Sequence, residues 1–230
     1  MQAKQFVVAV EPDQLKALSA VVKAHRDAER QWLAQIRKDF SLASLRGPNA
    51  TEARQKIRLR QAELRASGKL RGTADLVIAH ETKAVLRAQR LDRTWNPVPP
   101  RDSGAKGRQT GTASSRYPRT EDGEPALTGR LAVRLPADLG EQIVRAAYWH
   151  SAPAVEALRA WQKHWGDGPV VMMREAQRSG LTGDMANLAV ILAGMAPRAT
   201  VAAIEERIEL QSKILTTGDI LRDALKRAIS

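Results

Sequence analysis

The stretch GRLAVRLPADLGEQIVRAA, residues 129–147, changes its hydrophobic period part-way along its length. Three apolar residues alternate with other residues ahead of Pro136: Leu131, Val133 and Leu135. Alternation at every second residue is typical of a strand that buries one face. Beyond Pro136, Leu139 and Ile143 are spaced as on one side of a helix. The sequence therefore predicts a strand that leads directly into an amphipathic helix.

The opposite face of this predicted strand is small and basic, because it carries Arg130, Ala132 and Arg134. Arginine reads bases directly more often than any other side chain, through two hydrogen bonds to guanine. Two interpretations follow. In the first, the strand belongs to an ordinary strand–helix unit and completes a small sheet with the apolar run Phe6–Val10. In the second, it belongs to an element that contacts nucleic acid.

The same region resembles the ribbon-helix-helix family of DNA-binding proteins, of the Arc and MetJ type, over residues 130–165. The resemblance rests on the alternating strand, the Leu-Pro pair, two turns of helix, and a serine-led second helix in SAPAVEALRAW. It implies that two chains form a homodimer and pair one strand each into a ribbon that sits in the major groove. It further implies that Arg130, Ala132 and Arg134 face the bases, and that the helix N-terminus at Ser151 holds a backbone phosphate.

Composition favours a mainly α protein with a polyanionic partner. The chain has 230 residues, and its 37 Lys plus Arg exceed its 25 Asp plus Glu, which gives a formal charge of +12. A field of this sign raises the local concentration of nucleic acid. Only 4% of the residues are aromatic while 43% are hydrophobic, which favours helices packed through aliphatic side chains. We expect DNA as the partner, with RNA as the alternative.

Composition also divides the chain into three parts. Residues 1–95 are expected to form a helical N-terminal module, and residues 96–126 a linker rich in Pro, Gly, Ser and basic residues. Residues 127–230 then hold the strand–helix–helix unit and a C-terminal helical extension. We find no internal repeat of fixed period in the sequence.

Apolar spacing predicts helices along most of the remaining chain. The first begins at Pro12, since proline suits the first helical turn, and it is expected to stop at Gly47. A second is expected over about residues 51–68, and a third over 73–95, opening on a threonine that suits the N-cap. Near the end of the chain, residues 219–229 place their apolar side chains on one helical face.

The densest positive charge lies in the second predicted helix and just beyond it. Seven basic residues face the single acid Glu63 in this segment: Arg54, Lys56, Arg58, Arg60, Arg65, Lys69 and Arg71. Because like charges this close repel one another, we interpret the segment as a phosphate-binding surface rather than a merely solvated helix. In the linker, Arg108 and Arg116 either join this surface on binding or belong to a simple tether.

Two tryptophans, Trp161 and Trp165, fall with Leu158 on one stripe of a helix. A stripe of this kind predicts core packing. The alternatives are stacking on unpaired bases or a protein interface.

Motifs for catalysis are not found. The sequence has no cysteine, and its four histidines lack metal-ligand spacing. No phosphate-binding loop of the nucleotide-hydrolysing kind is present either. We therefore expect no enzymatic activity, no cofactor and no metal. No signal peptide or membrane span is indicated, so we expect a cytoplasmic protein.

The leading interpretation is a non-enzymatic DNA-binding regulator or mobile-element maintenance factor. One alternative is a helical subunit of a larger nucleoprotein complex, which would bind RNA or single-stranded DNA without sequence preference. The other is a structural or adaptor protein.

Overall fold

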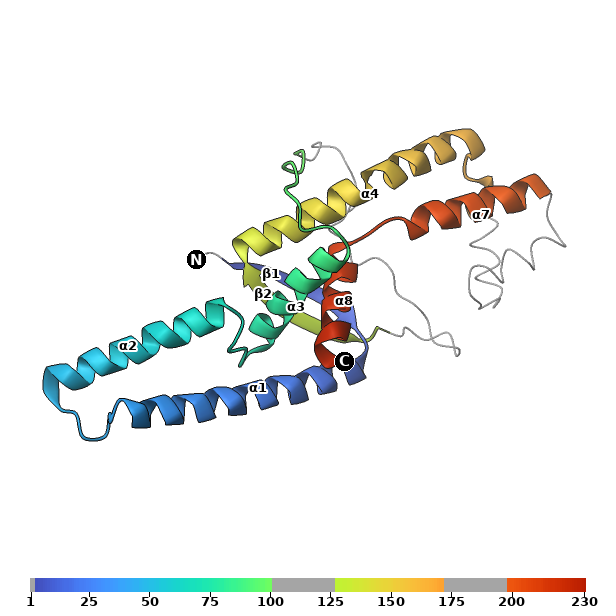
Figure 1. Cartoon of the computed structure of the whole chain (residues 1–230). Helices are drawn as coiled ribbons and strands as arrows, with labels where there is room; N and C mark the ends of the chain where they lie inside the picture. Colours follow the sequence, from blue (N-terminus) through green and yellow to red (C-terminus); the bar gives the residue numbers. More distant parts are fainter. Residues whose placement is uncertain (1–2, 101–126, 172–197) are drawn as a thin grey trace. The chain divides into compact units, whose positions relative to one another are not determined.

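The computed structural model describes residues 3–100, 127–171 and 198–230 (Figure 1). Helices dominate, and the mainly α class predicted from the sequence is confirmed. In chain order the elements are β1 (Ala3–Val10), α1 (Pro12–Asp39), α2 (Gly47–Ala66), α3 (Ala74–Ala88), β2 (Gly129–Pro136), α4 (Ala137–Trp165), α7 (Arg198–Ser212) and α8 (Thr217–Ile229).

β1 and β2 form a two-stranded antiparallel sheet, with Ala3 opposite Pro136 and Val10 opposite Gly129. The predicted alternation in β2 is confirmed, because Leu131, Val133 and Leu135 are all buried. The predicted pairing of this strand with the apolar run Phe6–Val10 is therefore confirmed. The place that the ribbon-helix-helix resemblance gave to the strand of a second chain is taken by β1 of the same chain.

Helices of the same compact unit contact the outer edge of each strand. The Arg134 N–H donates to Asp75 Oδ1 of α3 at 3.0 Å, so it points away from β1. Pro136, two residues further on, lies on the same edge, where its missing N–H costs no bond to β1. On the β1 edge, the Ala9 carbonyl accepts from Arg222 Nη1 of α8 at 3.3 Å.

α4 is one continuous helix, so the prediction of a second helix beginning at Ser151 is wrong. Ser151 lies inside α4 and is fully buried. Its hydroxyl donates to the Leu215 carbonyl at 2.8 Å and accepts from the Leu215 N–H at 2.9 Å. The buried stripe of Ala147, Ala154 and Trp161, spaced seven residues apart, keeps the helix running past Pro153. Ser151 therefore offers no helix N-terminus to a phosphate.

Helix ends near the N-terminus match the sequence in part. α1 begins at Pro12 as predicted, and Thr73 caps α3, since its side chain accepts from the Leu76 N–H at 3.3 Å. α2 begins at Gly47, four residues earlier than expected. α3 stops at Ala88 and does not reach the predicted end near residue 95, because Arg90 adopts a left-handed φ of 56°.

The described residues form two compact units that are not consecutive in sequence. The first comprises residues 3–92, 128–140 and 221–230. In it, α1 and α2 lie side by side as a helical hairpin (Figure 1). Its largest fully buried side chains come from α3, β2 and α8, and include Ile78, Leu86, Leu135, Leu221 and Leu225.

The second unit comprises residues 93–100, 127, 141–171 and 198–220. Trp161, 3% exposed, packs against Val170 and Ala203, with Trp165 partly buried beside them. The indole Nε1 of Trp161 donates to the Ala203 carbonyl at 2.9 Å and so connects α4 to α7. The prediction of core packing is confirmed for Trp161, while Trp165 and Leu158 are only partly buried.

Two adjacent valines of β1 test which face of the sheet carries the stability. Val8 is 2% exposed and Val7 is 56% exposed. We expect Val8→Ala to lower the free energy of unfolding by about 2 kcal/mol, through lost apolar burial and the cavity left behind. Val7→Ala, the matched control, is expected to change it by less than about 0.5 kcal/mol. Urea denaturation measures both, and equal effects would contradict the assignment of faces.

Candidate nucleic-acid interface

The exposed side of the two-stranded sheet, here named the ribbon face, presents eight side chains. They form four cross-strand pairs: Ala3 opposite Pro136, Gln5 opposite Arg134, Val7 opposite Ala132, and Ala9 opposite Arg130. All are exposed except Ala9, which is partly covered. The face therefore has an apolar centre and an arginine on β2 toward each end.

Neither arginine of the ribbon face has a carboxylate partner among the described residues. The residue across from Arg134 is the amide Gln5, and the residue across from Arg130 is Ala9. Asp75 lies close to β2, but it accepts the backbone N–H of Arg134. The two guanidinium groups thus keep their donors in a rigid fork that matches acceptor pairs on a base edge.

The seven basic residues predicted in and just beyond α2 differ in whether they form ion pairs. Four of the seven form ion pairs: Lys56 with Glu52 at 2.7 Å, Arg60 with Glu63 at 3.0 Å, Arg65 with Glu29 at 2.6 Å, and Arg71 with Glu81 at 3.0 Å. The first two pairs lie at the surface, where such pairs contribute little to stability. The last two involve buried or half-buried carboxylates.

Glu29 of α1 is a buried carboxylate, 6% exposed, that fastens α1 to α2. Its Oε1 accepts from Gln61 Nε2 at 2.6 Å and from Arg65 Nη2 and Nε at 2.6 and 3.0 Å. Burial by itself would raise the pKa of Glu29, but the hydrogen bonds from Gln61, Arg65 and the Gly72 backbone together hold that pKa below its usual value. Arg65 is therefore committed to the hairpin.

Arg71 is committed in a similar way. Glu81 of α3 accepts from Arg71 Nη1 through one oxygen and from Arg227 Nε of α8 through the other, each at 3.0 Å. Two arginines from distant parts of the sequence thus share one half-buried carboxylate. Arg71 joins the segment after α2 to α3 and contributes to the compact unit.

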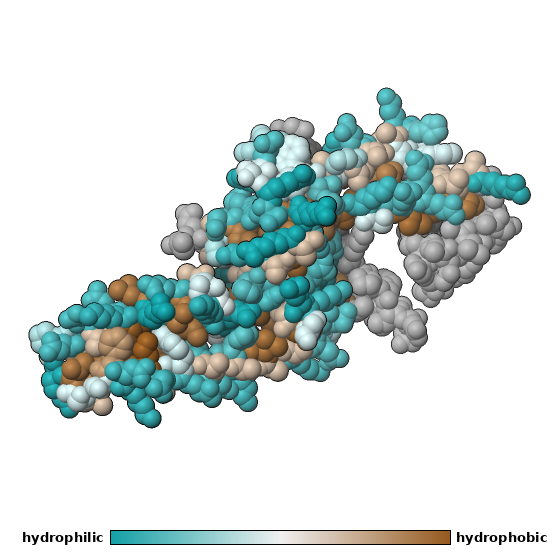
Figure 2. Space-filling model, viewed as in Figure 1, coloured by the Kyte–Doolittle hydropathy of each residue, from teal (hydrophilic) through white to brown (hydrophobic). Residues whose placement is uncertain are grey.

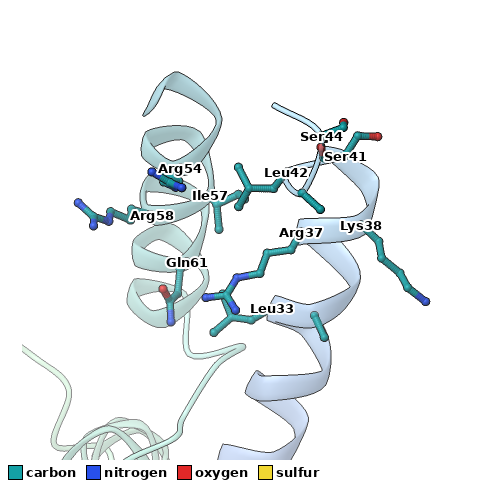
Figure 3. A pocket seen from close by; sticks show the side chains of 12 residues that line it. Leu33, Arg37, Lys38, Ser41, Leu42, Ser44, Arg54, Ile57, Arg58 and Gln61 are labelled. Atoms are coloured by element: carbon teal, nitrogen blue, oxygen red, sulfur yellow. Dashed lines mark hydrogen bonds between the residues drawn. The ribbon is translucent and has the colours of Figure 1, made fainter. Parts of the chain in front are cut away.

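The two cations Arg54 and Arg58 lie at a hollow of about 880 Å³ between the end of α1, the following turn and the start of α2 (Figure 3). Leu33, Leu42 and Ile57 point into this hairpin hollow (Figure 3). Over the hairpin, Figure 2 shows hydrophobic atoms at the surface between hydrophilic ones. The hollow therefore combines apolar walls with a basic rim.

Arg37 and Lys38 of α1 join the same rim. Arg37 extends toward the space between the two helices (Figure 3), and neither residue forms an ion pair within the ranges that the structure describes. Arg54 and Arg58 are likewise without a carboxylate partner there. The neighbouring Asp39 is engaged with Gln35 Nε2 at 2.8 Å. Four cations therefore line the hairpin hollow, with no carboxylate paired to any of them in the described ranges. Lys38 and Arg58 extend away from the space between the two helices (Figure 3).

The other basic residues predicted to contact nucleic acid are Lys69, Arg108 and Arg116. Lys69, just beyond α2, is exposed and has no ion pair in the described ranges. Arg108 and Arg116 lie outside the described residues, and their role stays a prediction.

Sequence reasoning missed three side chains of these surfaces. The alternation of β1 would have placed Gln5 outward. Arg37 and Lys38 sit in the last turn of α1, where basic residues are usually explained by the helix dipole alone.

Three further observations bear on the class of protein. Across residues 3–100, 127–171 and 198–230, no group of three or more His, Asp or Glu side chains is arranged to hold a metal ion. None of the helices in those ranges combines the length and apolar character needed to cross a membrane. Comparison with protein-family models, curated proteins and solved structures returns no match to this chain.

The buried Glu29 carboxylate generates a pH-dependent prediction. Because its folded pKa is lowered, Glu29 contributes stability above its unfolded pKa of about 4.5, and this contribution is lost as the pH falls through the folded pKa. Arg65→Met is expected to cost about 2 to 3 kcal/mol at neutral pH, because it leaves the buried charge with fewer partners.

Urea denaturation at pH 7 and at stepwise lower pH measures this effect. The difference between wild type and Arg65→Met should narrow as Glu29 becomes protonated in both. Arg60→Met, which removes an exposed ion pair on the same helix, is the control and should cost well under 1 kcal/mol. A deficit for Arg65→Met that stays constant with pH would contradict the assignment.

Proposed function

We propose that this protein is a non-enzymatic DNA-binding protein that places its ribbon face in the major groove. The observation that carries the proposal is the pair Arg130 and Arg134, which extend from the exposed face of an antiparallel two-stranded ribbon and have no carboxylate partner in the part of the chain that the structure describes. The major groove admits a two-stranded ribbon, and arginine recognises guanine there by two hydrogen bonds. The formal charge of +12 favours the approach of DNA.

Phosphate contacts are assigned to five cations that have no ion pair within the described residues: Arg37, Lys38, Arg54, Arg58 and Lys69. Arg108 and Arg116 of the linker, which lie outside the described residues, are assigned the same role from the sequence alone. Arg65 and Arg71 act through the fold, because their carboxylate partners are buried or half-buried. Lys56 and Arg60 contribute to the field, partly neutralised by neighbouring acids.

A protein of this kind acts by occupying a site on cytoplasmic DNA. This fits a regulator of transcription or a maintenance factor of a mobile element. The competing functions, a subunit of a nucleoprotein complex that binds single strands and an adaptor for acidic proteins, predict different behaviour in the experiment below.

The test is selection from pooled single- and double-stranded oligonucleotides at about 0.15 M salt, followed by sequencing of what the protein retains. We expect enrichment of particular duplexes. The double variant Arg130→Ala/Arg134→Ala should lose that enrichment, because each bidentate contact is worth about 1 to 3 kcal/mol of discrimination. Lys56→Ala/Arg60→Ala removes the same charge from paired positions and should retain the preferred sequences.

Two outcomes would contradict the proposal. Preferential retention of single strands of any sequence would favour the assembly subunit. Loss of every nucleic acid at this salt concentration would favour the adaptor.

The hairpin hollow supplies a separate prediction about affinity. Arg54→Ala/Arg58→Ala should weaken binding to all duplexes alike and reduce the slope of log affinity against log salt by about 2. Titration at several salt concentrations measures both quantities, on a preferred duplex and on an unrelated one. An effect confined to the preferred duplex would contradict the assignment of these arginines to phosphates.

A further inference from the structure

The described elements occur twice in the same order. A strand, a long helix and two shorter helices make up the first series, β1, α1, α2 and α3, and the second series is β2, α4, α7 and α8. Corresponding elements are similar in length: 8 and 8 residues for the strands, 28 and 29 for the long helices, 20 and 15, then 15 and 13 for the shorter helices.

The burial pattern of the strand and the long helix repeats at a constant interval. The matching buried pairs are Val8 and Val133, Val10 and Leu135, Leu18 and Ile143, and Val22 and Ala147. Each pair is separated by 125 positions, as 133 minus 8. Burial is thus conserved at this interval although the amino acids differ.

The sheet register follows the same interval. Val7 pairs with Ala132, its own equivalent 125 positions on, as 132 minus 7. The interval also exchanges the two neighbouring cross-strand pairs, because it relates Gln5 to Arg130 and Ala9 to Arg134. A two-fold axis therefore passes through the centre of the ribbon, between Val7 and Ala132.

The last helix of each series begins in a similar way, although its two copies are 143 positions apart, as 216 minus 73. α3 opens at Thr73, whose hydroxyl accepts from the N–H three residues later, and α8 opens after Thr216, whose hydroxyl does the same with Asp219 at 3.1 Å. The α3 side chain Asp75 then contacts the β2 edge at Arg134, and Arg222 of α8 contacts the β1 edge at Ala9. Residues 134 and 9 are equivalent by the 125-residue interval, so α3 and α8 each contact the outer edge of a strand at an equivalent position, through the N–H of Arg134 and the carbonyl of Ala9.

The two halves of the ribbon nevertheless carry different chemistry. Where β2 has Arg130 and Arg134, β1 has Gln5 and Ala9 at the equivalent positions. One end of the ribbon face thus presents Gln5 with Arg134, while the other presents Ala9 with Arg130. A symmetric pair of identical chains would present the same side chains at both ends.

We propose that a single chain recognises a non-palindromic duplex site through this asymmetric ribbon; the inference rests on the DNA-binding function proposed above. Arginine selects guanine, glutamine selects adenine, and the central Val7 and Ala132 suit thymine methyl groups. The four-residue separation between Gln5 and Ala9 spans about 13 Å, which corresponds to a core of about four base pairs. One end of that core should therefore tolerate substitution more than the other.

The experiment combines the selected duplex motif with the stoichiometry of its complex. We expect one chain of the full-length protein per duplex, measured by light scattering or native mass spectrometry, and a selected motif that lacks two-fold symmetry. A palindromic motif bound by two chains would overturn the inference while leaving the DNA-binding function intact. Failure to retain any duplex would instead contradict the proposed function, and this inference with it.

Restoring symmetry to the ribbon provides the sharper test. Gln5→Arg makes positions 5 and 130 identical, and Gln5→Arg/Ala9→Arg makes both equivalent pairs identical. The motif selected by the double variant should become palindromic, with guanine preferred at both ends and still one chain per duplex. The single variant, at an exposed position, should change the preferred base from adenine to guanine at one position of the motif even if the double variant folds poorly.

Gln55→Arg adds the same charge on the exposed surface of α2 and is the matched control. It should tighten binding to all duplexes slightly and leave the motif unchanged. Gln5→Arg could instead leave the motif unchanged and raise the affinity as the control does. That outcome would contradict base recognition by the β1 side of the ribbon face.

Discussion

The pairing of β1 with β2 is the constraint on which the rest of the structure depends. Two strands by themselves are marginally stable in water, so their apolar face must be covered and their outer edges satisfied. The first compact unit buries one face of the sheet, and Asp75 and Arg222 each form a hydrogen bond with one outer edge. Because the pairing joins residues 3–10 to residues 129–136, it also decides that the ribbon face is built within one chain.

Carboxylate partners separate the basic residues into two groups. Glu29 is buried and pairs with one arginine, and the half-buried Glu81 pairs with two, so these three arginines are removed from the free surface charge. Removing an arginine from such a partner leaves a charge in a poorly solvated place, so these contacts belong to stability. Within the described ranges, the arginines of the ribbon face and of the hairpin hollow have no carboxylate partner. The proposed interface is therefore defined as much by missing carboxylates as by the presence of cations.

A two-fold axis inside one chain has a consequence that a homodimer cannot have. Two identical chains must present the same residue at equivalent positions, so a change in one is a change in both. In this chain the equivalent positions are encoded separately, so each can be substituted by itself. The buried pairs are apolar at both positions, whereas exposed pairs such as Gln5 and Arg130 differ. Packing constrains both copies equally, whereas the exposed positions are free to diverge.

Local periodicity by itself determined much of this protein: the mainly α class, the two faces of β2, the threonine start of α3, the apolar face of α8 and the core role of Trp161. These follow from the period of strands and helices and from short-range capping. Only the tertiary structure decided that β2 pairs with β1, that Ser151 lies inside a helix, and that Arg65 is paired while Arg58 is not. Arg58 and Arg65 share one face of α2, and only the position of Glu29 on a different helix distinguishes them. Sequence reasoning also did not find the repeat, because the features that recur are burial and strand register and not residue identity.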